Sequence, residues 1–301
     1  MTSSARLASS PLEYLAPATL EQLLEVLSDL GPKAKVIAGG TDLVPAMRKG
    51  KLPPAVTTLI SLRNLSLSYI RESAEGLRIG AATPHADVAA SPLVRREAPL
   101  LATGSGAVGS LQIRNVATIG GNIANAGPSA DTSAPLLALD AQLVVAGRHG
   151  RRTLPIPEFY SGPSQNSLEP GEVVVEFLLP KLAPHTGTHY VKFSPRSFMD
   201  LAWVGVAVVA TFDPAGRVCQ DARLGLAAVN PFPMRAVKAE AVIRGREITG
   251  DLIAVMARAA SEECNPNPRS RRVPAWYRRE MVAVLTRRGF LEARRIATGV
   301  N

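Results

Sequence analysis

Two short segments combine adjacent glycines with a threonine, and their residue types could hold a ligand. They are AGGTD at residues 38–42 and TIGGN at residues 118–122. Each offers backbone N–H groups that no Cβ atom obstructs, together with a hydroxyl. One such segment alone is more often a tight turn. Two of them could hold both halves of a pyrophosphate without a cation, with Asp131 accepting hydrogen bonds from a ribose or an adenine.

The usual catalytic and metal-binding groups are scarce in this chain. It has four histidines, and only His185 and His189 have ligand spacing, without a carboxylate near them in the sequence. The two cysteines, Cys219 and Cys264, lie far apart and outside any C-x-x-C motif. The sequence contains no G-x-S-x-G motif and no P-loop. We therefore predict no catalytic side chain and no metal site in this chain.

A third glycine-rich segment, GSGAVG at residues 104–109, matches the G-x-G-x-x-G dinucleotide motif. That motif indicates a Rossmann site only when a strand precedes it and a helix follows. The preceding segment, SPLVRREAPLLAT, is helical in character. We interpret residues 104–109 as part of a closely packed helix.

Strands and helices in the first half of the chain must position the two glycine segments. TLEQLLEVLSDLGP at residues 19–32 predicts a helix with a capping box between Thr19 and Gln22. A strand at residues 35–38 follows, then the first glycine segment and a short helix in LVPAMRKG. A strand, a glycine pair and a helix start can direct backbone N–H groups at a phosphate. Further strands are predicted in residues 55–62, 66–70, 76–83 and 172–180, and residues 128–147 should pass from a capped helix into another strand.

A change in composition at residues 180–189, PKLAPHTGTH, suggests a domain boundary. We therefore predict two domains, residues 1–183 and 184–301. The second should contain three strands within residues 189–193, 201–212 and 216–229, covered by helices near residues 235–245, 249–263 and 274–288. This order of elements predicts an α+β protein.

The formal net charge of +9 is concentrated near the C-terminus. A basic stretch can indicate nucleic-acid binding. Here, however, apolar residues recur at near-helical spacing between arginine pairs, which favours a solvated or partner-facing helix. Nine arginines lie in this region: Arg269, Arg271, Arg272, Arg278, Arg279, Arg287, Arg288, Arg294 and Arg295.

The composition is that of an ordinary globular protein. The 301 residues are 46% hydrophobic and 20% charged, which is enough for a substantial core. There is no uncharged apolar run of 18 or more residues, and the first residues lack the long apolar stretch of a secretory signal. We expect a cytoplasmic protein without a membrane span.

Four segments, in order, closely resemble signatures of one family. They are AGGTDLVPAMRKG, QIRNVATIGGNIANAGPSAD, KFSPRSFMDLAWVGVAV and PAWYRREMVAVLTRRG. Together they are similar to the FAD-binding medium subunit of molybdenum hydroxylases, the group of xanthine, carbon monoxide, nicotine and aldehyde dehydrogenases. The resemblance covers nearly the whole chain, and four ordered matches are more specific than any single glycine motif.

The resemblance implies a fold and a cofactor site. The fold would be a PCMH-type FAD-binding domain of two α+β subdomains, followed by three antiparallel strands packed against helices. The FAD pyrophosphate would lie between the glycine segments, Asp131 would contact the adenosine side, Lys192 would lie near the flavin ring and Val174 would make a backbone contact. The first pyrophosphate loop would comprise Val36, Ile37, Ala38, Gly39, Gly40, Thr41, Asp42 and Leu43, and the second Thr118, Ile119, Gly120, Gly121 and Asn122. A β-branched residue at Gly120 should then empty the FAD site while leaving the fold largely intact.

The resemblance also implies partners. A large subunit would carry molybdopterin and a small subunit two [2Fe–2S] clusters, in a heterotrimer or a dimer of heterotrimers. This chain would pass electrons from the clusters to an external acceptor. Two alternatives stay open: a stand-alone FAD oxidoreductase with its own substrate, and a basic scaffold or nucleic-acid-binding protein that uses the arginine-rich region.

Overall fold

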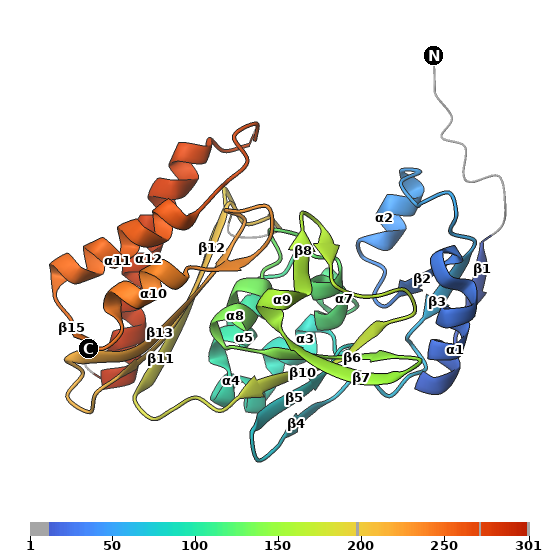
Figure 1. The fold of residues 1–301 in the computed structure, drawn as a ribbon, viewed down its shortest axis with the longest axis horizontal. Coiled ribbons are helices and arrows are strands. Elements are labelled where there is room, and N and C mark those ends of the chain that lie inside the picture. Colours follow the sequence, from blue (N-terminus) through green and yellow to red (C-terminus); the bar gives the residue numbers. More distant parts are fainter. Residues whose placement is uncertain (1–11, 197–198, 271, 300–301) are drawn as a thin grey trace.

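The computed structural model describes residues 12–196, 199–270 and 272–299. Arg271 and the start of the predicted first domain, residues 1–11, lie outside the described residues. Figure 1 shows a small strand and helix unit (blue), a central unit (green) and a C-terminal unit of long strands and helices (yellow to red). No helix in the described ranges is long and apolar enough to cross a membrane.

The first unit is a parallel sheet of three strands, in the order β1-β3-β2, packed against helix α1. Thr19 caps α1: its Oγ1 accepts a hydrogen bond from Gln22 N at 3.3 Å, and Gln22 Oε1 accepts one from Ala18 N at 3.0 Å. The predicted helix is therefore confirmed. The strand β2 leads directly into the first glycine segment, which is followed by α2. The elements are β1 (Glu13–Leu15), α1 (Leu20–Leu30), a 3₁₀ turn (Gly31–Lys33), β2 (Ala34–Ile37), α2 (Leu43–Arg48) and β3 (Thr58–Ser61).

The central unit is an antiparallel sheet in the order β4-β5-β10-β6-β7. Its middle strands are buried on both faces. Val173 and Val175 pack toward the first unit, and Val174 and Phe177 pack toward the helices on the other face. This explains the apolar residues on both sides of Glu176 in EVVVEFLLP, where Glu176 itself is buried and paired with Arg78. The strands are β4 (Ile70–Glu72), β5 (Gly76–Gly80), β6 (Gln142–Gly147), β7 (Gly150–Pro155) and β10 (Val173–Pro180), with a small hairpin of β8 (Tyr160–Gly162) and β9 (Gln165–Asn166) beside them.

Short helices cover one face of this sheet and carry the second glycine segment. The G-x-G-x-x-G motif begins at the C-terminal end of α5, so its interpretation as part of a closely packed helix is confirmed for the first residues of the motif. A Cβ atom on Gly104 would lie 2.8 Å from the Asp131 carbonyl oxygen, which is the close contact that glycine permits. The helices are α3 (His85–Ala90), α4 (Pro92–Glu97), α5 (Pro99–Gly106), α6 (Leu111–Arg114), α7 (Ile119–Ala124), α8 (Ser133–Ala138) and α9 (Ile156–Phe159).

The C-terminal unit contains the three predicted antiparallel strands, β11, β12 and β13, and two short strands that pair with β13. Its helices pack on one face of this sheet. The last helix runs ten residues beyond its predicted end because Phe290 and Ala293 stay buried against the sheet. In the sequence, frequent arginines obscure the helical spacing of the apolar residues in this last part of the helix. The elements are β11 (Thr186–Phe193), β12 (Val204–Phe212), β13 (Val218–Ala227), β14 (Met234–Arg235), α10 (Val237–Ile243), β15 (Arg246–Glu247), α11 (Gly250–Glu263) and α12 (Ala275–Thr298).

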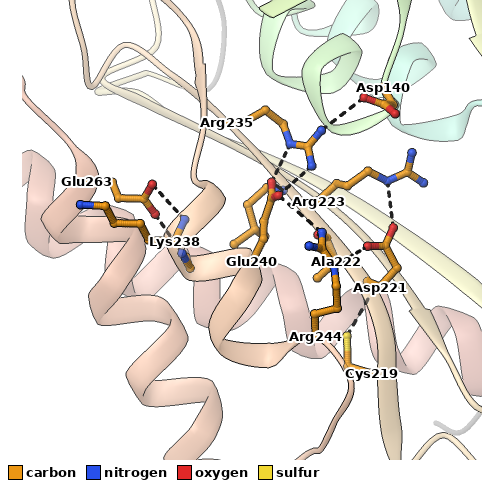
Figure 2. Close-up of polar contacts among 12 residues, drawn as sticks. Asp140, Cys219, Asp221, Ala222, Arg223, Arg235, Lys238, Glu240, Arg244 and Glu263 are labelled. Atoms are coloured by element: carbon orange, nitrogen blue, oxygen red, sulfur yellow. Dashed lines mark hydrogen bonds and ion pairs between the residues drawn. The ribbon is translucent and has the colours of Figure 1, made fainter.

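The other face of this sheet packs on the central unit. Gly225 in β13 permits the closest approach, because a Cβ atom there would lie 2.1 Å from the carbonyl oxygen of Ala134 in α8. An ion-pair network lies beside this contact. Figure 2 shows Arg235 between Glu240, whose carboxylate is 2.6 Å away, and Asp140 at the end of α8, 3.3 Å away. The two units are therefore joined by backbone packing and by charge.

Candidate functional site

The structure brings the two glycine segments into direct contact. A Cβ atom on Gly39 would lie 1.9 Å from the carbonyl oxygen of Val116, which leads into the second segment. A Cβ atom on Gly121 would lie 3.8 Å from Ala38 and 3.0 Å from Thr118 Oγ1. Gly39 thus permits the contact between the segments, and Gly121 lies half-buried on the side of the second segment that faces the first.

The first segment presents free backbone donors. Within the described ranges, the N–H groups of residues 39–42 make no hydrogen bond to protein, and Gly40 has a left-handed backbone with a φ of 70°. These groups lie between the end of β2 and the start of α2, as the sequence predicts. Burial raises the pKa of Asp42, and its side chain does not cap α2. The segment can therefore bind an anion through the main chain.

The second segment differs from its prediction, because its backbone donors are used inside the fold. Ile119 N donates to Thr83 O at 3.0 Å, and Gly120 N donates to Ala81 O at 2.8 Å. Thr118 caps α7: its Oγ1 accepts from Gly121 N at 3.0 Å, and its carbonyl accepts from Asn122 N at 3.0 Å. The expectation that both segments offer free backbone donors is wrong for the second one.

The second segment contains a side-chain amide, that of Asn122, that could bind a ligand. Asn122 Oδ1 accepts a hydrogen bond from Thr132 Oγ1 at 2.6 Å. This bond fixes the orientation of the amide and leaves Asn122 Nδ2 as a donor. The segment therefore contributes an anchored asparagine.

Gly120 faces the interior of the central unit. It is buried, and a Cβ atom there would lie 2.5 Å from the Ala81 carbonyl oxygen and 2.7 Å from Ala81 Cβ. A β-branched residue at Gly120 would therefore press on Ala81, directly after β5, and displace α7. We therefore expect such a variant to lose stability as well as FAD, which differs from the expectation that its fold stays largely intact.

Asp131 and Lys192 form one buried cluster. Lys192 Nζ lies 2.8 Å from Asp131 Oδ2 and donates to Ala107 O at 2.8 Å, while Tyr190 OH donates to Asp131 Oδ1 at 3.0 Å. Burial raises the pKa of Asp131 to about 6, against the opposing effects of Lys192 and Tyr190. Since Asp131 and Lys192 touch, they cannot contact opposite ends of an extended dinucleotide. The expected positions of Asp131 on the adenosine side and of Lys192 near the flavin ring therefore cannot both hold.

Val174 lies behind the second glycine segment. It is buried in β10 at a bulge between Val174 and Glu176. The neighbouring Val175 O accepts a hydrogen bond from Ala81 N at 3.0 Å, and Ala81 O in turn accepts one from Gly120 N. Val174 therefore supports the segment from one layer away, and its side chain belongs to the core.

Sequence reasoning missed Tyr190 and Thr132. Tyr190 could have been found, because it lies two residues before Lys192 on the same face of β11. Thr132 gives no such signal, since its partner Asn122 lies in another helix. Among the described residues, no group of three or more histidine, cysteine or acidic side chains could hold a metal ion.

Several arginines of the basic region hold the C-terminal unit together. Arg279 Nε donates to Cys264 O at 3.2 Å, and Arg294 Nε donates to Gly216 O at 3.0 Å. Arg278 donates to Ala228 O. These three side chains bind main-chain carbonyls, which accounts for part of the basic character of α12 without a nucleic acid.

Comparison with known families identifies both parts of the chain. Residues 10–182 match the model described as the FAD binding domain in molybdopterin dehydrogenase. Residues 189–293 match the CO dehydrogenase flavoprotein C-terminal domain. The chain belongs to the molybdenum hydroxylase flavoprotein family. It is an FAD-binding medium subunit and a component of an oxidoreductase.

Individual relatives align over most of their length. The carbon monoxide dehydrogenase medium chain of Hydrogenophaga pseudoflava is 35% identical over 84% of this chain and 87% of its own. The glyceraldehyde dehydrogenase medium chain of Sulfolobus acidocaldarius is 32% identical over 93% and 97%. A solved structure of H. pseudoflava carbon monoxide dehydrogenase, which lacks the Mo-pyranopterin moiety, has a TM-score of 0.89 at 34% identity and covers 94% of this chain and 97% of the matched one. This molybdenum hydroxylase flavoprotein therefore has the predicted α+β architecture.

Proposed function

We propose that this chain is the FAD-carrying electron-transfer subunit of a multi-subunit molybdenum-dependent dehydrogenase. It would pass electrons from the [2Fe–2S] clusters of a partner to an external acceptor. The observation that carries the proposal is the contact between the two glycine segments, with free main-chain donors on the first and the fixed side-chain amide of Asn122 on the second. Bound FAD would accept electrons singly from the clusters and deliver them in pairs.

The first segment would be the main pyrophosphate ligand. The N–H groups of residues 39–42 would donate to the phosphate oxygens, with Val36 and Ile37 holding the loop against β3 and Leu43 starting α2. Asn122 would add its Nδ2 donor from the opposite side. Backbone and amide donors bind a diphosphate without adding a cation, which accounts for the lack of lysine and arginine in both segments.

We place the Asp131 and Lys192 pair at the flavin end of the cofactor. The ammonium group of Lys192 is anchored by Asp131 and Ala107 O in a largely buried position. A cation fixed beside the flavin ring would stabilise the negative charge that reduction places on the ring. Asp131 would hold that cation in place and would not reach the adenosine.

The partners would be a small subunit with two [2Fe–2S] clusters and a large subunit with molybdopterin. The names of the relatives support this, since they are medium chains or FAD subunits of larger enzymes. The assembly would be a heterotrimer or a dimer of heterotrimers in the cytoplasm.

Co-purification of the tagged full-length chain from its native host tests the proposal. We expect two partner polypeptides and a visible spectrum that combines flavin and iron–sulfur absorption. Purification of a flavoprotein that lacks an iron–sulfur partner and reduces its flavin with an organic substrate would contradict the proposal and favour the stand-alone oxidoreductase.

A further inference from the structure

We propose that Arg278, in the C-terminal unit, is a positioning residue for the cofactor site and acts through Ala228 and Pro128. The inference rests on the proposed FAD site. Arg278 donates through Nη1 to the carbonyl of Ala228, and the N–H of Ala228 donates to the carbonyl of Pro128 at 2.6 Å. Pro128 belongs to the connection between α7 and α8, residues 125–132, which also contains Asp131.

Ala228 has a backbone conformation that needs support. It directly follows β13, has a φ of 66° and is 3% exposed. Alanine rarely adopts this left-handed conformation because its Cβ atom approaches its own carbonyl group. A buried carbonyl also requires a hydrogen-bond partner. The guanidinium of Arg278 supplies that partner and so favours the one conformation in which Ala228 N points at Pro128.

Arg278 also contacts a second part of the C-terminal unit. Its Nη2 donates to Ser270 Oγ at 3.3 Å, whereas its Nε is buried without a hydrogen-bond partner among the described residues. Burial lowers the pKa of Arg278, and the nearby Arg272 lowers it further. An arginine nevertheless stays charged at neutral pH. A charged donor on a buried carbonyl is stronger than a neutral one.

The connection at residues 125–132 transmits this constraint to the cofactor site. The C-terminal unit holds it at Pro128 through Ala228 and at Asp131 through Tyr190 and Lys192. Its last residue, Thr132, binds the Asn122 amide at 2.6 Å. A displacement of Pro128 would therefore change both the amide that faces the pyrophosphate and the carboxylate that anchors Lys192.

Titration of the full-length apoprotein with FAD, followed by flavin fluorescence, tests this role. We expect Arg278→Met to weaken FAD binding about tenfold or more, and Arg278→Lys, which keeps one charged donor, to recover part of the loss. Arg294→Met is the matched control, because Arg294 also lies in α12 and donates to a main-chain carbonyl, that of Gly216. It should bind FAD within about twofold of the wild type, even if its melting temperature falls.

Hydrogen exchange of the same apoproteins gives a readout that does not depend on FAD. Peptides that cover residues 125–132 should exchange faster in Arg278→Met than in the wild type. In Arg294→Met their exchange rate should equal that of the wild type. Equal FAD affinity in Arg278→Met and wild type, or equal losses in Arg278→Met and Arg294→Met, would overturn the inference. A wild-type chain that binds no FAD would instead overturn the proposed function, and the exchange result would then show separately whether Arg278 orders the connection.

Discussion

At the scale of single residues, the glycines of the two segments have different tasks. Gly39 permits the contact between the segments, Gly120 packs against Ala81 at the end of β5, and Gly121 lies close to Thr118 and Ala38. The sequence predicts which residues are small enough for close approach, but all three look alike in it. The nearest neighbours of these glycines are Val116, Ala81 and Thr118. The positions of these three neighbours follow from the packing of α7 on the sheet.

Gly121→Val tests this division. The new side chain would stand on the side of Gly121 that faces the first segment, where the nearest atoms to its Cβ are Thr118 Oγ1 at 3.0 Å and Ala38 Cβ at 3.8 Å. We expect FAD affinity to fall by at least an order of magnitude while the apoprotein keeps most of its thermal stability. Gly120→Val should instead lose about 3 kcal/mol of stability through overpacking. Thermal denaturation and FAD titration of both variants check this, and full FAD occupancy in Gly121→Val would count against the site.

The raised pKa of Asp131 predicts that the stability of the protein depends on pH. Its pKa is about 6 in the folded chain, raised from 3.8 mainly by burial, so between these values the folded state binds more protons than the unfolded state. The contribution of Asp131 to stability is therefore fully present below about pH 4 and is lost as the pH rises through 6. Relative to Asp131→Asn, the wild-type apoprotein should gain about 1–3 kcal/mol between pH 7 and pH 4. Urea denaturation at several pH values measures this difference, and a difference that shrinks as the pH falls would refute it.

At the scale of elements, the sequence predicts those features of helices and strands that depend on contacts between neighbouring residues. The Thr19 cap of α1 and the order of β2, glycine segment and α2 follow from neighbouring residues, and the structure contains both, although Gln22 Oε1 accepts from Ala18 N and not from Thr19 N. The donors of the second segment could not be predicted, because their acceptors Ala81 and Thr83 lie about 40 residues earlier in the chain. The end of α12 was missed because Phe290 and Ala293 are buried by the sheet, and their arginine neighbours obscure the pattern.

The cap of α7 gives a prediction at this scale. Thr118→Ala removes the acceptor for Gly121 N and should cost about 1 kcal/mol of stability. It should also weaken FAD binding, because α7 carries Asn122. Thr249→Ala is the matched control: Thr249 Oγ1 caps α11 in the same way, by accepting from Leu252 N at 3.1 Å, far from the glycine segments. Chemical denaturation should show similar losses for both variants, and an equal effect of both on FAD affinity would argue against this role.

At the scale of the whole molecule, the proposed cofactor site includes contacts between the two parts of the chain. Asp131 belongs to the central unit, whereas Tyr190 and Lys192 belong to β11 in the C-terminal unit. Composition cannot predict such a contact across about 60 residues, and the family resemblance had placed the two charges at different ends of the cofactor. The Asp131–Lys192 pair and the contact of Gly225 with Ala134 join the two parts, so the proposed site would need both of them.

The flavin content of the purified full-length chain tests the central claim most directly. The protein should be yellow, and denaturation should release about one FAD per chain, identified by chromatography. An apoprotein prepared from it should rebind FAD to the same ratio. A colourless protein that also fails to bind added FAD would contradict the account.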